Sequence, residues 1–195
     1  MPHAARGSLT DVASRGEILR FALVLGLCLA LLNAETLTGA RVLSPADALL
    51  TSASFRQADG SARVDEPRNK LLIDVALQFE PWLAMCRESI QEGRLPLWND
   101  RAGCGSPLLA NGQSAVFDPF HALAYWGPWP WSLAAMAVGR LWVAGIGMFL
   151  FSARLGLGPW GRWFAGLSFP FCGFLTVWLL FPVTNVAVWL PWLLW

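Results

Sequence analysis

The residues best suited to chemistry lie in one polar stretch between apolar segments. Asp74 supplies a carboxylate that can accept a proton. Gln78 follows one helical turn later, so both side chains project from the same helix face. Carbohydrates are held by planar amides and stacked aromatic rings, and the candidates of these two kinds are Asn99, Asn111 and Gln113, and Trp82 and Trp98. The alternative is structural: Asp74 ends a helix, Gln78 is solvated and each amide belongs to a turn.

Metal ligands are also present in this stretch. Their spacing matches no compact metal-binding loop, although carboxylates and imidazole suit a hard divalent cation. The candidates are Asp74, Glu80, Asp100, Asp118 and His121. A divalent cation therefore stays a candidate cofactor with no ligands assigned. The sequence has no G-x-S-x-G, no phosphate-binding glycine loop and no Cys/His spacing typical of a nucleophile or zinc.

The composition indicates a membrane protein. Hydrophobic residues make up 55% of the chain, charged residues 14%, and there are twelve tryptophans. The mean hydropathy of +0.47 exceeds that of ordinary soluble domains. The net charge is +1 and Lys70 is the only lysine, so no basic cluster indicates nucleic acid. We expect an all-α polytopic membrane protein with a long loop, part helical and part irregular, between its first two transmembrane helices.

The hydropathy pattern divides the chain into four segments. Residues 1–16 form a cytoplasmic tail, 17–37 a first transmembrane helix, 38–130 an extracytoplasmic loop with interfacial helices, and 131–195 transmembrane helices two, three and a truncated four. Within the last segment we place the spans at 132–151, 163–180 and from 186 onward. The fourth run stops at Trp195, short of the length that a bilayer requires, so we expect an N-terminal fragment. For the first run the alternative is a cleaved signal peptide, against which the bulky Leu32 argues.

The basic residues indicate orientation. Arg6 and Arg15 in the tail, and Arg154 and Arg162 around a short turn, fall on the same side, which the positive-inside rule makes cytoplasmic. The long loop is then extracytoplasmic, at a bacterial cytoplasmic membrane. Arg140 falls near the middle of the second span, where it is costly and should face a cavity, a carboxylate or a phosphate-bearing ligand. The alternative for Arg140 is a structural ion pair.

Local signals subdivide the long loop. Ser44-Pro45 predicts a short helix through Leu50, and residues 57–68 read as an exposed connection. A helical pattern over 69–79 meets Pro81, which breaks or kinks a helix. The next helix, over 81–92, ends at Gly93 and presents an apolar face to the bilayer interface or to the loop's own core. The remainder is a series of turns.

The cysteines leave one question open. Cys86 and Cys104 both fall in the polar stretch, whereas Cys28 and Cys172 lie in apolar runs. A Cys86–Cys104 disulfide requires an oxidising compartment, and only the expected orientation of the loop supports it.

The polar stretch resembles the N-terminal part of the YfhO family of bacterial membrane proteins. The matching blocks are Asp74-x-x-x-Gln78-x-x-Pro81-Trp82, Gly93-Arg94-Leu95-Pro96-Leu97-Trp98-Asn99, Gly105-x-Pro107-Leu108 and Gln113-Ser114-Ala115-x-Phe117-x-Pro119. The resemblance covers the chain from about Leu71 to its end, with the spans similar only in pattern. One departure is Asp118, where the family pattern suggests an aromatic residue.

The resemblance implies a glycosyltransferase of the GT-C type. Such enzymes take a sugar from a polyprenyl-phosphate carrier and transfer it to an acceptor of the cell envelope, without a soluble nucleotide sugar. An acidic residue of the first extracytoplasmic loop does the central work, a role that the resemblance places on Asp74. A carboxylate in a partly desolvated cleft can serve as the general base. The alternatives are a non-catalytic polytopic protein, such as a transporter or assembly scaffold, and an inactive fragment.

Overall fold

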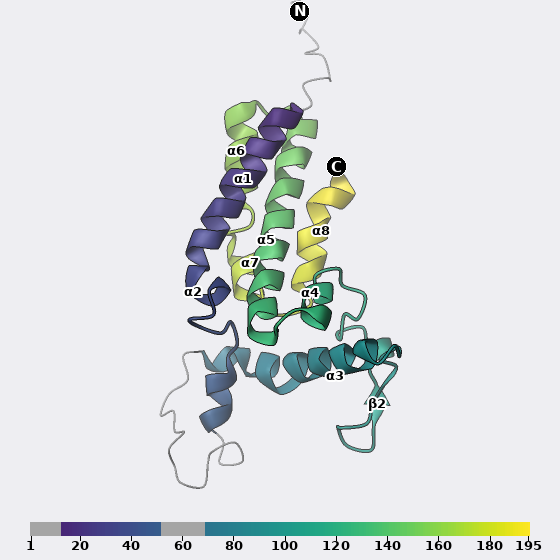
Figure 1. Ribbon diagram of the computed structural model, residues 1–195. Helices are drawn as coiled ribbons and strands as arrows, with labels where there is room; N and C mark the ends of the chain where they lie inside the picture. Colours follow the sequence, from purple (N-terminus) through teal and green to yellow (C-terminus); the bar gives the residue numbers. More distant parts are fainter. Residues whose placement is uncertain (1–12, 52–68) are drawn as a thin grey trace, which may run out of the picture. The chain divides into compact units, whose positions relative to one another are not determined.

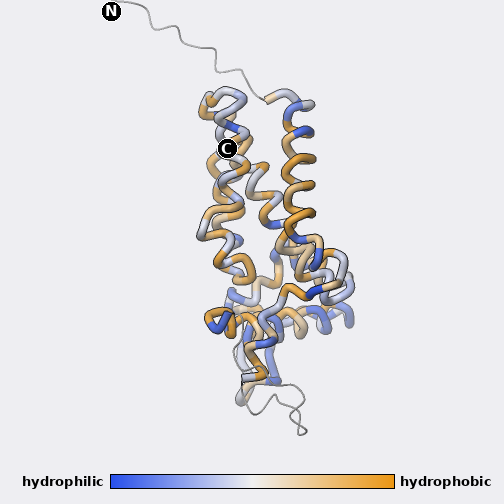
Figure 2. Tube along the Cα trace, turned by 90° about the vertical axis from the view of Figure 1, so that its left-hand side faces the viewer, coloured by the Kyte–Doolittle hydropathy of each residue, from blue (hydrophilic) through white to orange (hydrophobic). Residues whose placement is uncertain are grey.

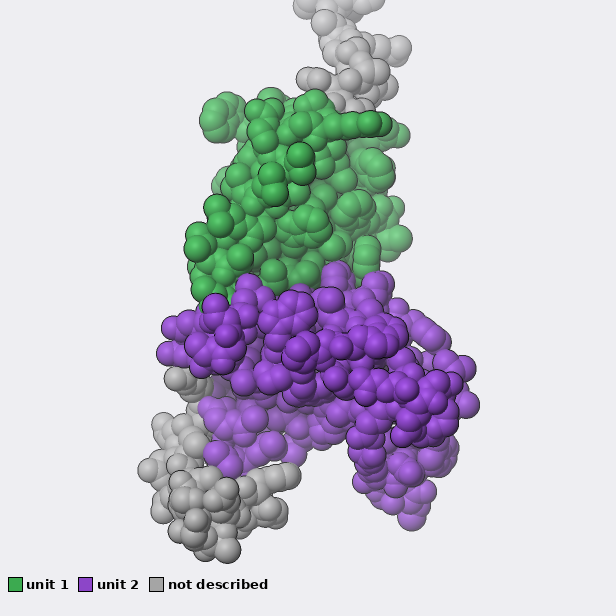
Figure 3. Space-filling model, viewed as in Figure 1, with its two compact units in different colours: residues 1–34, 137–179, 183–195 green, residues 35–136, 180–182 purple. Residues whose placement is uncertain are grey.

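The structure, a computed structural model, describes residues 13–51 and 69–195 and is mostly helical. It divides into two compact units (Figure 3). Unit 1 comprises residues 1–34, 137–179 and 183–195, and unit 2 comprises residues 35–136 and 180–182. Most of the expected cytoplasmic tail and the connection over 57–68 lie outside the described residues.

Unit 1 is built from helices (Figure 1). These are α1 (Arg15–Leu32), most of α5 (Trp129–Arg154), α6 (Pro159–Ser168), α7 (Gly173–Val177) and α8 (Thr184–Leu194). Ser14 caps α1 by accepting a hydrogen bond from the Glu17 N–H to its hydroxyl at 3.2 Å. Beyond its polar start α1 is apolar along its length (Figure 2).

Helix α5 is the longest element. Among the described residues it is the one helix long and apolar enough to cross a membrane, and 67% of its most apolar window is buried within the structure. Membrane spans and buried core helices of soluble proteins share these properties. Helix α5 contains the second predicted span, residues 132–151, and extends it at both ends.

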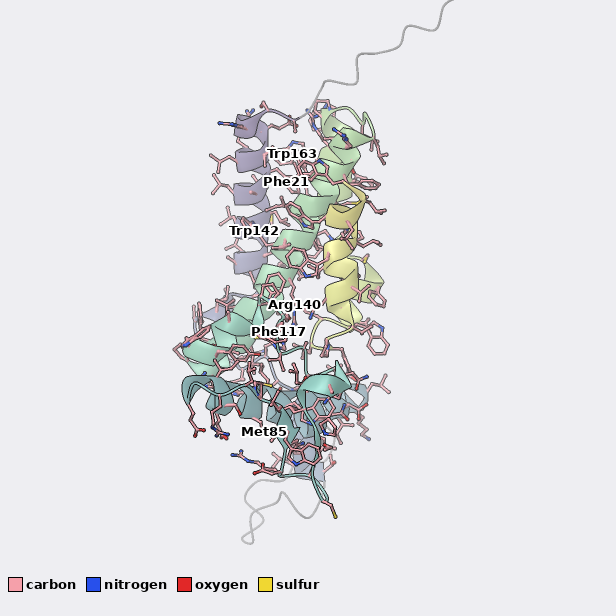
Figure 4. All side chains as sticks on the ribbon, turned by 90° about the vertical axis from the view of Figure 1, so that its right-hand side faces the viewer. Phe21, Met85, Phe117, Arg140, Trp142 and Trp163 are labelled. Carbon is pink, nitrogen blue, oxygen red and sulfur yellow. The ribbon has the colours of Figure 1, made fainter. Side chains whose placement is uncertain are left out.

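Close packing in unit 1 depends on glycines and aromatic rings. Phe21 of α1 stacks on Phe149 of α5 with ring centroids 4.4 Å apart, and Trp163 of α6 meets Phe21 edge-on (Figure 4). A Cβ at Gly166 would lie 2.5 Å from the Phe21 ring, and one at Gly145 would lie 2.9 Å from the Gly166 carbonyl. Without side chains at these two positions, α5 and α6 approach backbone to backbone.

Two tryptophans bond neighbouring helices through their indole N–H groups. Trp142 of α5 donates to the Ala22 carbonyl of α1 at 2.8 Å, and Trp192 of α8 donates to the Val143 carbonyl of α5 at 2.9 Å. Gly147 leaves room for the Trp192 ring, since a Cβ there would lie 2.4 Å from the indole nitrogen. These bonds tie α1 and α8 to α5.

The third apolar run, expected as one span over 163–180, is two helices. Helix α6 ends at Ser168 and α7 begins at Gly173. Pro170 lies in the gap, where it has no N–H to donate and its ring would clash with the carbonyl four residues earlier. The prediction of one continuous helix here was wrong because it ignored this proline.

Unit 2 holds most of the polar residues in short elements. They are α2 (Ala34–Leu37), the 3₁₀-helices η1 (Ala46–Thr51), η3 (Lys70–Leu72) and η5 (Leu109–Asn111), the π-helical turn η4 (Val75–Phe79), α3 (Glu80–Gln91) and α4 (His121–Trp126). Strands β1 (Trp98–Asn99) and β2 (Ser106–Pro107) pair antiparallel, with Trp98 opposite Pro107. The short helix after Ser44 and the end of α3 before Gly93 are confirmed. The strand pair was not predicted.

A buried ion pair joins α1 to α6. Arg162 donates from Nε and Nη2 to the two carboxylate oxygens of Glu17, at 2.8 and 2.6 Å. The Arg162 side chain is 5% exposed and that of Glu17 14%. Its guanidinium also lies over the Phe149 ring, 5.9 Å from the centroid.

Replacing one residue of the Glu17–Arg162 pair should lower the free energy of unfolding more than replacing both. Arg162→Met leaves the Glu17 carboxylate buried without its counter-charge, so we expect a loss of about 3 kcal/mol in the free energy of unfolding. The double variant Glu17→Met/Arg162→Met should recover most of this loss. Denaturant unfolding in detergent micelles measures both. Equal losses in the single and double variants would show that the ion pair adds nothing beyond packing.

Candidate functional site

The predicted break at Pro81 takes the form of a widened helical turn. The N–H of Glu80 donates to the Val75 carbonyl, five residues back, and Pro81 then occupies the first turn of α3, where its missing N–H costs nothing. The wider π turn keeps the chain helical up to the proline. Asp74 directly precedes this turn and Gln78 lies in it. Single π turns are frequent at functional sites.

The structure brings two of the predicted amides together. Gln78 Nε2 donates to Gln113 Oε1 at 3.5 Å, although the residues are 35 positions apart in the chain. Asp74, one turn before Gln78, is exposed. The described residues therefore do not form the desolvated cleft expected around Asp74.

The other predicted amides hold turns. Asn99 is buried, and its Oδ1 accepts a hydrogen bond from the Arg101 N–H at 2.9 Å. Asn111 Oδ1 accepts from the Ser114 N–H at 2.8 Å. Both are side-chain to backbone bonds of the kind that Asn makes in loops. Trp82 is half-buried and meets Phe79 edge-on at 5.8 Å. None of these contacts is to another predicted site residue.

Helix α3 is fixed to α4 by two side chains that the sequence did not identify as important. Arg87 Nη1 donates to the carbonyls of Ala124 and Gly127 at 2.5 and 2.6 Å, and Gln91 Nε2 donates to the Tyr125 carbonyl at 2.7 Å. They cap the end of α4, whose last carbonyls lack helical partners. Arg87 and Gln91 are four residues apart, so they share one face of α3, and this spacing was the available signal.

Asp118, the departure from the family pattern, has a structural role. Its Oδ1 accepts the Phe120 N–H at 3.1 Å at the start of α4, and its Oδ2 lies 3.5 Å from His121 Nε2. Both side chains are buried, with exposed fractions of 2% and 6%. Residues 13–51 and 69–195 contain no group of three or more His, Cys, Asp or Glu side chains that could hold a metal. No three of the five candidate ligands therefore form one centre.

A pocket of about 590 Å³ lies between α3 and the β1–β2 hairpin. Its lining combines apolar side chains, an indole and charged groups: Met85, Glu88, Ser89, Arg94, Leu95, Leu97, Trp98, Asp100 and Arg101. This lining includes Trp98, a predicted sugar-stacking residue, and Asp100, a candidate metal ligand. Asp74, Gln78 and Gln113 are not part of it.

Glu80, at the junction of the π turn and α3, is a carboxyl with a perturbed pKa. Burial raises its pKa above the ordinary value of 4.5, and the nearby Ser44 hydroxyl offsets part of that rise. Ser44 also lines a second hollow, of about 420 Å³, together with Arg41 and Asn69. The sequence placed Glu80 only among possible metal ligands.

Arg140 lies in unit 1, on α5. The residue is 3% exposed, and its Nη1 donates to the Leu179 carbonyl at 3.2 Å. This hydrogen bond to the backbone uses one of the N–H groups of the guanidinium. Binding of a phosphate by Arg140 stays a prediction.

No disulfide joins Cys86 and Cys104 in the structure. Cys86 is buried in α3, and burial raises its pKa to about 11, whereas Cys104 is exposed. The two thiols therefore differ in accessibility.

Comparison with protein-family models, with curated proteins and with solved structures finds no match to this chain. The resemblance to the YfhO family depends on the residue blocks quoted above and stays a prediction.

The pKa of Glu80 predicts a pH-dependent gain from its amide analogue. The folded protein binds the Glu80 proton more tightly than the unfolded chain does. The contribution of Glu80 to stability is therefore fully present below pH 4.5 and is lost as pH rises through the raised pKa. Glu80→Gln should raise the melting temperature at pH 8 by about 2 °C or more and change it little at pH 4. Thermal scans across this range measure the effect. Glu35→Gln, which changes an exposed carboxylate of the same unit, serves as the matched control. A gain for Glu80→Gln that does not depend on pH would contradict the assignment.

Alkylation distinguishes the two loop cysteines. At pH 8 a thiol with a pKa of about 11 is ionised to roughly one part in a thousand. N-ethylmaleimide should therefore label Cys104 within minutes and leave Cys86 unlabelled until the protein unfolds. Mass spectrometry of peptides from the folded protein reads both sites. If neither reacts before reduction and both react after it, the residues are bridged and the free-thiol structure is wrong.

Proposed function

We propose that this protein is a membrane glycosyltransferase of GT-C type, which moves a sugar from a polyprenyl-phosphate carrier to an extracytoplasmic acceptor at a bacterial cytoplasmic membrane. The observation that supports the proposal best is the Gln78–Gln113 contact of 3.5 Å, which joins residues from two separate blocks of the resemblance, with Asp74 one helical turn before Gln78. The long apolar helix α5 suits a membrane location. The protein is an all-α polytopic one in this proposal.

In the proposed reaction Asp74 is the general base. It accepts the proton of the acceptor hydroxyl as that oxygen attacks the anomeric carbon, and the bond from that carbon to the carrier's phosphate oxygen breaks. The carrier phosphate leaves with the electron pair. Gln78 and Gln113 hydrogen-bond sugar hydroxyls through amides that already lie together. The bound lipid-linked donor covers the exposed Asp74 and removes water from it.

A second candidate is a transporter or assembly scaffold without catalytic activity. The observation that favours it is the gap between α6 and α7, because membrane carriers bind solutes where helices are interrupted. The buried Arg140, which donates to the Leu179 carbonyl beyond α7, adds an ionisable group of the type found in such carriers.

Sugar transfer by Asp74→Asn decides between the two candidates. Membranes containing the full-length gene product receive a labelled polyprenyl-phosphate sugar, and transfer is compared at matched expression. The amide keeps the shape of the side chain but removes the base, so we expect a loss of about a hundredfold or more. The matched control is Glu35→Gln, which removes an exposed carboxylate paired with Arg41 in the same unit.

Equal transfer by wild type and Asp74→Asn would make Asp74 structural. If the folded wild type transfers sugar from no carrier tested, the glycosyltransferase proposal fails and the transporter or scaffold candidate replaces it.

A further inference from the structure

The pocket between α3 and the hairpin presents an aromatic face at a defined position. Trp98 is 56% exposed even though its ring packs over Gly105. A Cβ at Gly105 would lie 2.4 Å from the indole nitrogen, and Gly105 has a φ of +92°, which L side chains rarely adopt. Glycine at this position therefore lets the ring lie against the opposite strand while much of the ring stays available to a ligand.

Charged groups on the pocket wall are held in place by one another. Arg101 of the hairpin donates to the Glu88 carboxylate of α3 through both Nη atoms, one of them at 3.3 Å. Arg94 Nε donates to Glu92 at 3.0 Å. The Arg101–Glu88 pair connects the hairpin that carries Trp98 to α3.

We propose that this pocket binds a saccharide. A pyranose ring has an apolar C–H face that stacks on an indole and a rim of hydroxyls that donate to carboxylates and accept from guanidinium groups. The pocket offers these partners together: Trp98 for the ring face, Glu88 and Asp100 as acceptors, and Arg94 and Arg101 as donors. Its volume of about 590 Å³ is in the range of small-ligand sites.

The pocket is separate from the proposed catalytic residues. At about 1.5 Å per residue, the helical path from Asp74 to Glu88 covers roughly 20 Å. A single sugar ring cannot contact both. The pocket is therefore an accessory subsite, and its assignment to the acceptor glycan, as opposed to the carrier-linked donor, depends on the proposed function. Saccharide binding itself does not depend on it.

Binding to a printed glycan array tests the proposal without measuring transfer. The probe is the purified full-length protein in detergent micelles, labelled at an added terminal tag. We expect wild type to retain a defined subset of glycans, and Trp98→Ala to bind that subset about tenfold more weakly, as is typical for the loss of a central aromatic contact. Trp98→Phe should keep part of the binding because a smaller ring face remains.

The matched control is Trp160→Ala, which removes a tryptophan that is 90% exposed on α6. It should bind as wild type does, and melting temperatures show whether each variant is folded. No retained glycan, or equal retention by Trp98→Ala, overturns the proposal. A second measurement compares wild type with Trp98→Ala for binding to anionic phospholipid vesicles. If wild type binds the vesicles and Trp98→Ala does not, Trp98 and its neighbours Leu95 and Leu97 form a lipid-binding surface and the saccharide assignment is wrong.

The glycan-binding and sugar-transfer assays test the subsite and the proposed enzyme activity independently. Binding without transfer leaves the subsite intact and removes the catalytic proposal. Transfer by a protein that binds no glycan on the array, and is unchanged by Trp98→Ala, keeps the enzyme and removes the subsite. To identify the source of the sugar, the array carries free acceptor-type glycans and a competing arm adds the polyprenyl-phosphate sugar in micelles. Competition by the latter identifies the donor as the occupant.

Discussion

The Arg87 guanidinium is the contact on which the arrangement of unit 2 depends. One nitrogen donates to two carbonyls at the end of α4, at 2.5 and 2.6 Å. A six-residue helix has too few internal hydrogen bonds to be stable alone, so its end must be stabilised by neighbours. Because Arg87 and Gln91 both belong to α3, α3 and α4 form one body. The π turn at one end of α3 and the hairpin beyond its other end take their positions from this body.

The π turn shows how one proline shapes the candidate site. Pro81 supplies no N–H, and an ordinary α-helix entering it would clash at the carbonyl four residues earlier. The turn over Val75–Phe79 widens, and the Glu80 N–H reaches back to Val75. Asp74, before this turn, is exposed, whereas Glu80, after it, is partly buried near Ser44. Burial raises the pKa of Glu80, which the sequence identifies only as a candidate metal ligand.

The parts of the fold that were predictable are those that local chemistry determines. Gly93 ends α3 with a φ of +72°, Pro45 begins a short helix, and the apolar run around Arg140 is one long helix. The contact between Gln78 and Gln113 was not predictable, because a spacing of 35 residues carries no geometric information. Asn99 and Asn111 were chosen for their amide groups, yet each amide is used by its own turn. Pro170 interrupts the third apolar run in the same way as Pro81 interrupts the helix before it, but the continuous hydropathy around Pro170 favours a single span.

The indole bonds of unit 1 have a consequence for how its helices are aligned. The hydrophobic effect is non-directional, so apolar contacts alone discriminate weakly between axial alignments of two helices that differ by one turn. Trp142 and Trp192 each donate to one particular carbonyl, Ala22 and Val143, on a neighbouring helix. These directional hydrogen bonds fix the axial position of each helix relative to its neighbour, which non-directional apolar contacts do less strongly. Two of the twelve tryptophans, Trp142 and Trp192, thus align neighbouring helices through their indole N–H groups.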